Sequence, residues 1–241
     1  MDEVPLHQTF REFTPGHMAL LQNEVHVFAV PLFGDAERYA EWLSQDERER
    51  AERYLILDHR RRYAITHGAL RVILSCYLGV DPSSLQFAFG PRGKPSLLDD
   101  GPQFNLSHSA QMAMVAVASA PIGIDCEKLR HLERLLDIAK RQFSAAEYAA
   151  LKEVPEADRL LAFYRCWTRK EAYVKALGLG LAALDVFDVD LGERARLLAL
   201  RDGQVLEDWS MLDISPSDGF VGACAVRLPR AHLLGYRLGE L

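Results

Sequence analysis

The sequence has little of what a nucleic-acid-binding, secreted or membrane-spanning protein needs. Its 28 Lys and Arg residues are outnumbered by 34 Asp and Glu, which gives a formal net charge of −6 and no general basic surface for nucleic acid. The first ten residues lack the apolar segment of a signal peptide. No apolar run approaches the roughly 20 residues that span a bilayer. We therefore expect a cytoplasmic chain whose partners include neither nucleic acid nor a membrane.

Cysteine is also scarce. The four cysteines, Cys76, Cys126, Cys166 and Cys224, are widely spaced and form no C-x-x-C pair. This spacing favours buried free thiols in a reducing compartment over a disulfide framework. The remaining composition, 49% hydrophobic and 26% charged, is that of an ordinary globular protein, and 241 residues suffice for one large domain or two small ones.

Hydrophobic patterning predicts strands and helices in a similar order in the two halves of the chain. Ser44 and Ser144 each precede a glutamate by three positions, the capping box that begins a helix, and Gly79 and Gly178 each follow a long helical pattern. We expect one helix to continue from Ser44 through the arginine-rich stretch, and NLSHS at 105–109 to be a polar loop. The strands are expected at 25–30, 87–89, 112–118, 122–127 and close to 220–228.

Four short segments contain residue types suited to phosphate and metal chemistry. In IGIDCE, Asp125 and Glu127 are two apart, so on a strand both carboxylates point to the same face. Adjacent carboxylates repel unless a cation or a proton lies between them, and oxygen ligands suit Mg²⁺. In WTRKEAYVK, Glu171 and Lys175 are four apart and share a helix face. Taken alone, each of these two segments is better explained by solvated surface residues.

The other two segments are weaker signals by themselves. Ser107 and His108 in NLSHS suit contacts to an anion, and the motif lacks the glycines of a nucleophilic serine elbow. Gly93-Lys94-Pro95 is a rigid turn that could present backbone groups to a planar base. It is not a Walker loop, because the earlier glycine and the following Ser or Thr are absent.

Taken together and in this order, GKP, NLSHS, PIGIDCE and WTRKEAYVKALGLGL resemble the Sfp-type 4′-phosphopantetheinyl transferases. The motif core covers residues 93–181, with weaker similarity back to about residue 44. The resemblance implies a mixed α+β (α/β) fold of two pseudo-symmetric lobes with coenzyme A between them. We expect an N-terminal lobe at 1–120 with the adenine and 3′-phosphate contacts, and a C-terminal lobe at 121–241 with the metal site and carrier docking.

The resemblance also implies roles for individual residues. Asp125, Glu127 and Glu171 match Mg²⁺ ligands, and Glu171, directly or through a water, is the implied base for the carrier serine. Lys175 matches the lysine at the pyrophosphate. The remaining coenzyme A contacts implied are Gly93, Lys94 and Pro95 at the adenine, Ser107 and His108 at the phosphates, and Arg50 and Arg62 at the 3′-phosphate.

The implied reaction transfers 4′-phosphopantetheine from coenzyme A to a serine of an apo acyl or peptidyl carrier protein and releases 3′,5′-ADP. The carrier is expected to dock close to residues 130–150, and the enzyme to be a monomer. Glu47 departs from relatives that have a lysine there for the nucleotide. Two alternatives remain at this point, a Mg²⁺-dependent nucleotide pyrophosphohydrolase and a non-catalytic coenzyme A-binding module.

Overall fold

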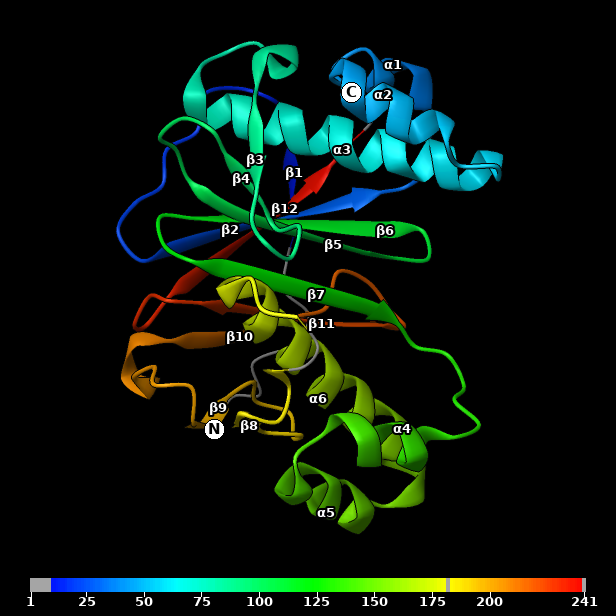
Figure 1. Cartoon of the computed structure of the whole chain (residues 1–241), viewed down its shortest axis with the longest axis vertical. Coiled ribbons are helices and arrows are strands. Elements are labelled where there is room, and N and C mark those ends of the chain that lie inside the picture. Colours follow the sequence, from blue (N-terminus) through cyan, green and yellow to red (C-terminus); the bar gives the residue numbers. More distant parts are fainter. Residues whose placement is uncertain (1–9, 181–182, 240–241) are drawn as a thin grey trace.

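A computed structural model describes residues 10–180 and 183–239. Within them the fold is a mixture of α-helices and several β-sheets (Figure 1). The helices are α1 (Ala36–Ala40), α2 (Gln45–Glu52), α3 (Leu57–Leu78), α4 (Leu135–Gln142), α5 (Ala145–Glu153) and α6 (Glu156–Leu177), with short 3₁₀ turns at Pro82–Ser84 and Leu206–Asp208. The strands are β1 (Arg11–Phe13), β2 (Glu24–Pro31), β3 (Phe87–Phe89), β4 (Pro95–Leu97), β5 (Gln103–Ser109), β6 (Met112–Ala118), β7 (Ile122–Lys128), β8 (Phe187–Val189), β9 (Leu197–Leu200), β10 (Ser210–Ile214), β11 (Phe220–Val226) and β12 (His232–Leu238).

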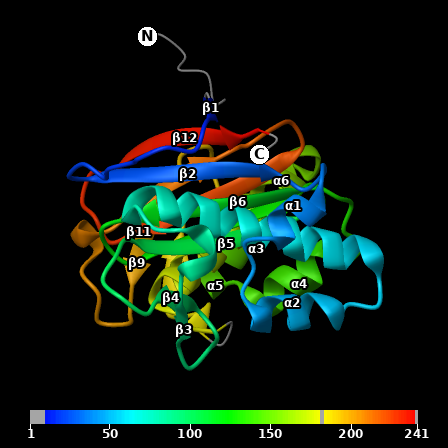
Figure 2. The same cartoon turned by 90° about the horizontal axis from the view of Figure 1, so that it is seen from above.

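Two sheets lie between two long helices. The first sheet has the strand order β1-β12-β2-β6-β5, and the second has the order β10-β11-β7. Helix α3 covers the outer face of the first sheet and α6 that of the second, while apolar residues of β2, β6, β7 and β11 fill the space between the sheets (Figures 1 and 2). The edge strands β5 and β7 adjoin, so the two sheets meet there.

The segment NLSHS is a strand, which corrects the prediction of a polar loop. It lies within β5 and pairs antiparallel with β6 over Gln103–Ser109. Phe104 and Leu106 pack into the core beneath α3, while Asn105 and Ser107, on the opposite face, are buried beside β7. The polar residues are therefore buried at a junction of two sheets, where the partners of their side chains come from elsewhere in the chain.

The arginine-rich stretch also differs from the prediction, because the helix that begins after Ser44 does not continue through it. Helix α2 ends at Glu52, and α3 begins at Leu57 after a non-helical turn. The turn brings α2 back against α3, where Glu47 Oε2 accepts a hydrogen bond of 2.6 Å from Arg71 Nε. Both capping boxes are present, and Gly79 and Gly178 end α3 and α6 in the left-handed conformation, as predicted.

The first sheet combines strands from both halves of the sequence. Strand β12, close to the C-terminus, pairs in parallel with β1 and β2 in the first sheet. The predicted boundary at residue 120 separates β6 from β7 and stays a prediction. All four cysteines are buried and free, as expected. No helix in the described part of the chain combines the length and apolar character needed to cross a membrane.

Gly123 allows α6 to lie directly on β7. A Cβ atom at this position would lie 2.0 Å from the carbonyl oxygen of Ala172 and 2.3 Å from the backbone nitrogen of Ala176. No side chain can be accommodated at such distances without separating the helix from the strand. The close approach places the C-terminal half of α6 beside the carboxylates of β7.

We predict that Glu47→Gln destabilises the fold in a pH-dependent way. Burial alone would raise the pKa of Glu47, but hydrogen bonds from His67 and Ser44 N–H and the Arg71 charge lower it to about 2. Because this pKa lies below its unfolded value, the stabilisation is complete above about pH 4.5 and is lost as the pH falls toward 2. At pH 7 the variant leaves the buried Arg71 without its partner, which costs about 3 kcal/mol.

Urea unfolding of both proteins between pH 7 and pH 3 measures this effect. The difference in free energy of unfolding should narrow below pH 4.5. A difference that stays constant over this range would contradict the assigned ion pair.

Candidate active site

A row of polar side chains from β5 fastens the second sheet to the first. Asn105 Oδ1 accepts a hydrogen bond of 2.9 Å from Ile124 N, and Ser107 Oγ donates one of 2.8 Å to Asp125 Oδ1. Farther along, Ser109 Oγ donates to Glu127 Oε2 at 2.6 Å. Every second residue of β5 thus contacts β7, and two of these contacts hold the Asp125 and Glu127 carboxylates.

Helix α6 adds a cation to this junction. Lys175 Nζ donates to Asp125 Oδ1 at 2.6 Å and to Ser107 Oγ at 3.2 Å, so β5, β7 and α6 meet at one point. Glu171 lies one turn earlier on α6, and the charges of Asp125, Glu127 and Lys175 act on it. Cys126 faces the other way into the core between the sheets, as strand alternation predicts.

The carboxylates are close enough to affect each other's protonation. Burial raises the pKa of Glu171, and the Asp125 charge raises it further. Burial likewise raises the pKa of Glu127, against the opposing effect of the Ser109 hydrogen bond. In the region described, no group of three or more His, Cys, Asp or Glu side chains is arranged to hold a metal ion as it stands. Asp125 Oδ2 and Glu171 Oε1 are nevertheless buried without a hydrogen-bond partner.

Two adjoining cavities open beside α3, one between α2, α3 and the hairpin of β3 and β4, the other between α3, the turn before it and β5. The larger, of about 450 Å³, is lined by Arg50 and Pro95 among others, and the smaller, of about 220 Å³, by Arg62 and His108. Tyr63 and His67 line both. Burial lowers the pKa of His108, and the positive charges of Lys175, His67 and Arg62 lower it further. His59, Arg62, His67 and His108 give the smaller cavity a basic lining suited to a phosphorylated ligand, whereas Asp46 and Glu47 offset Arg50 and Arg71 in the larger one.

Two of the predicted nucleotide contacts have partners within the protein. Arg62 forms an ion pair of 2.6 Å with Asp58, and Arg50 is exposed, with its guanidinium carbon 5.8 Å from the centre of the Tyr63 ring. Glu47 lines the larger cavity, and its charge is compensated by Arg71.

The Gly93-Lys94-Pro95 turn joins β3 to β4. Gly93 has φ of 79°, a left-handed conformation that favours glycine. Lys94 Nζ donates to the carbonyl oxygens of Ile122 and Ala176, at 2.9 and 2.8 Å, and burial lowers its pKa to about 8. Its ammonium group therefore joins the hairpin to the start of β7 and the end of α6.

The structure brings Ser107, Asp125, Glu127, Glu171 and Lys175 together. Gly93, Lys94 and Pro95 lie on the hairpin, and Arg50, Arg62 and His108 lie on the two cavities.

Sequence reasoning missed Ser109 and Asn105, which hold β7, and His67 and Tyr63, which line the cavities. The alternation of apolar and polar residues in FNLSHS was the sequence signal for Asn105 and Ser109.

Comparison with known proteins agrees with these motifs. A family model of the 4′-phosphopantetheinyl transferase superfamily matches residues 121–225. The 4′-phosphopantetheinyl transferase HetI of Nostoc sp. is 41% identical over 222 residues, which cover 88% of this chain and 91% of that protein. The 4′-phosphopantetheinyl transferase Sfp of Bacillus subtilis is 34% identical over 171 residues, covering 70% and 72%.

The match with HetI covers 88% of this chain and so extends well beyond the motif core. The resemblance inferred from the four motifs is thereby confirmed. This chain belongs to the 4′-phosphopantetheinyl transferase superfamily and is a 4′-phosphopantetheinyl transferase.

Proposed function

We propose that the enzyme transfers the 4′-phosphopantetheine arm of coenzyme A to a serine of an apo carrier protein, with Mg²⁺ held by Asp125, Glu127 and Glu171. The observation that carries this proposal is the pair of buried, unpartnered oxygens Asp125 Oδ2 and Glu171 Oε1. Buried carboxylate oxygens without hydrogen-bond donors are costly unless a cation or proton compensates them.

The donor set fits a hard divalent cation. All three candidate ligands are carboxylates, and Mg²⁺ prefers oxygen ligands while it keeps positions for water and substrate phosphate. Ser109 and Ser107 hold the second oxygens of Glu127 and Asp125 from outside, which fixes the direction of the carboxylates. When bound, the ion supplies positive charge that offsets the charge on a diphosphate.

The protein's own groups supply the rest of the chemistry. Lys175 provides a fixed positive charge beside Asp125, where the diphosphate of coenzyme A is proposed to lie. Glu171, with its raised pKa, is the proposed acceptor of the proton from the carrier serine, directly or through a water. The serine oxygen attacks the β-phosphorus, the bond to the leaving phosphate breaks, and 3′,5′-ADP departs with the electron pair.

The two cavities beside α3 are the proposed site of the nucleotide. The adenine would lie against the turn at Gly93 and Pro95, and the 3′-phosphate would approach Arg50, Arg62 and His108. The side chain of Lys94 supports this arrangement indirectly, because it ties the hairpin to β7 and α6, which carry the reacting groups.

Carrier docking is proposed along residues 130–150. Arg134, Lys140 and Arg141 are exposed there, which suits an acidic carrier surface. Leu135 and Ile138 pack partly against the enzyme's own core, so the basic residues of α4 are more accessible than the apolar ones. A monomer of two pseudo-symmetric lobes would present this surface and the nucleotide cavities together.

We predict that Glu171→Gln reduces transfer at least 100-fold, the lower end of the effect of a general base. The assay incubates the enzyme with coenzyme A, Mg²⁺ and an apo carrier protein, and measures the carrier's gain of one phosphopantetheine by mass spectrometry. Glu156→Gln, at the other end of the same helix, is the control and should keep wild-type activity. Wild-type turnover of the Glu171 variant would exclude the proposed metal and base role.

We predict that Arg50→Ala weakens binding of coenzyme A by about tenfold, because a charge-assisted contact to the 3′-phosphate is lost. Dephospho-coenzyme A lacks that phosphate, so its affinity should change little. Calorimetric titration of both ligands measures the difference, with the exposed Arg48→Ala as control. Equal weakening of the two ligands would remove the 3′-phosphate assignment from Arg50.

A further inference from the structure

The nucleotide cavities are built on an internal clamp of three side chains. Glu47, within the capping box begun by Ser44, pairs with Arg71 of α3. The Arg71 guanidinium carbon lies 5.1 Å from the centre of the Phe87 ring on β3, and its NH1 atom donates to two backbone carbonyls just before that strand. The clamp therefore fixes helix α2 and the β3 strand to α3, and the larger cavity lies between these elements.

The same clamp occurs a second time, about one hundred residues later. Glu147, within the capping box begun by Ser144, pairs with Lys170 of α6 at 2.8 Å. Lys170 Nζ lies 4.3 Å from the centre of the Phe187 ring on β8 and donates to the Phe187 carbonyl at 2.9 Å. Helices α3 and α6 both have 22 residues, and Arg71 and Lys170 are each the fifteenth.

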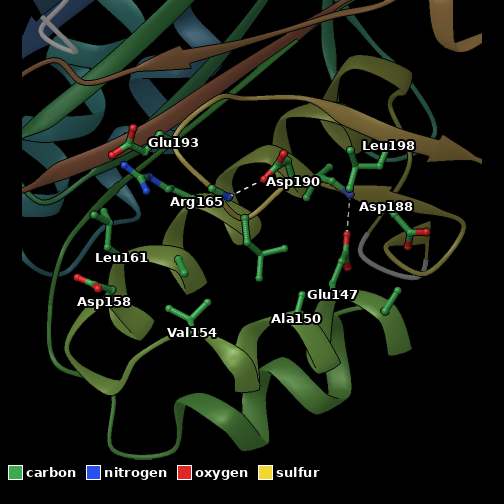
Figure 3. Close-up of a pocket in the computed structure, with 15 residues that line it drawn as sticks. Glu147, Ala150, Val154, Asp158, Leu161, Arg165, Asp188, Asp190, Glu193 and Leu198 are labelled. Atoms are coloured by element: carbon green, nitrogen blue, oxygen red, sulfur yellow. Dashed lines mark hydrogen bonds between the residues drawn. The ribbon is translucent and has the colours of Figure 1, made fainter. Parts of the chain in front are cut away.

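The second clamp also lies beside a cavity, which no step of the proposed reaction uses. This cavity, of about 790 Å³, lies between α5, α6 and the β8–β9 hairpin. Its volume lies within the range of small-molecule sites. Figure 3 shows its labelled lining residues, with Asp158, Arg165 and Glu193 toward one end and Asp188 toward the other.

Side chains at matched helix positions line both sets of cavities but differ in size and charge. Two aligned aromatic or basic residues are replaced by alanine, which enlarges the second cavity, and one histidine is replaced by an acid. These matched pairs are Arg50 and Ala150, His59 and Asp158, Arg62 and Leu161, and Tyr63 and Ala162. Two further matched pairs, Asp46 with Ala146 and Thr66 with Arg165, change charge in the opposite direction.

The second cavity is therefore unsuited to a phosphorylated ligand. Asp188 is paired with Arg201, and Asp190 with Arg196. In the described part of the chain, the side chains of Asp158, Arg165 and Glu193 form no hydrogen bond or ion pair, so two free acids oppose one free base. Val154, Leu161 and Leu198 provide apolar lining.

We infer that the cavity between α5, α6 and the β8–β9 hairpin is a second ligand site, which takes a small organic cation with an apolar body and a protonated amine. The apolar body would contact Val154, Leu161 and Leu198, and the ammonium group would approach Asp158 and Glu193. The site uses the same helix pair, clamp and hairpin as the nucleotide cavities, with the preference for charge reversed.

The test titrates phenethylamine into the ¹⁵N-labelled full chain and follows backbone amide shifts. Saturable shifts are expected in α5, the first half of α6 and β8–β9. The anion 3-phenylpropanoate, of similar size, should produce no saturable shifts there. Absence of saturable shifts with the amine, or equal binding of the anion, would overturn the proposal.

Variants of the cavity test where the ammonium group of phenethylamine binds. The double change Asp158→Asn with Glu193→Gln should weaken phenethylamine by about tenfold, since each exposed charge pair contributes up to about 1 kcal/mol. Leu161→Arg, which introduces the cation found at the matched position of α3, should also weaken it. Glu153→Gln removes an acid of α5 that does not line the cavity and should leave affinity unchanged. Equal affinity in the double variant and wild type would contradict the site.

Discussion

Mutual repulsion among three carboxylates is the constraint on which the rest of this structure depends. Asp125 and Glu127 share one face of β7, and Glu171 faces them from α6. Ser107, Ser109 and Lys175, from two other places in the chain, compensate part of this charge by direct hydrogen bonds. Burial and, to a smaller extent, the charge of Asp125 raise the pKa values of Glu127 and Glu171, so these buried carboxylates are only partly compensated. The junction of β5, β7 and α6 is thus arranged to receive positive charge, which is the physical reason for the metal proposal.

Packing at the adjoining parts of β7 and α6 determines whether the carboxylates meet. Gly123 lets α6 lie against β7, and Lys94 fastens the β3–β4 hairpin to the ends of the same two elements. A nucleotide held by the hairpin would therefore keep a fixed relation to the groups that act on its diphosphate. Positioning of this kind accounts for much of the catalysis of phosphoryl transfer, where the protein does little covalent chemistry itself. Lys94 is half-buried and has a structural role: its hydrogen bonds to two backbone carbonyls offset the cost of burying its ammonium group.

Local signals predicted local structure well, and long-range contacts account for what they missed. The sequence predicts the capping boxes at Ser44 and Ser144 and the glycines that end α3 and α6, because each depends on residues within one or two helical turns. The strand β5 was missed because its polar residues indicate a loop until β7 is known to lie beside them. Similarly, nothing adjacent to Glu47 indicates that Arg71 compensates it, or that β12 returns to the first sheet. The site residues could be proposed from motif order, but their contacts could not.

The two clamps stabilise the fold, whereas other side chains determine the charge of the adjoining cavities. In each, a capping-box glutamate, a helix cation and a phenylalanine on the following strand hold a helix pair to a hairpin. Clamp residues such as Glu47 and Glu147 line the adjoining cavities, but most of the other lining side chains take no part in the clamp and can change without loss of the scaffold. Those around α3 are mostly basic or aromatic, whereas those around α6 are mostly acidic, aliphatic or small. Because an electrostatic preference depends on such lining residues and not on the frame, one arrangement of backbone can serve an anion in one place and a cation in the other.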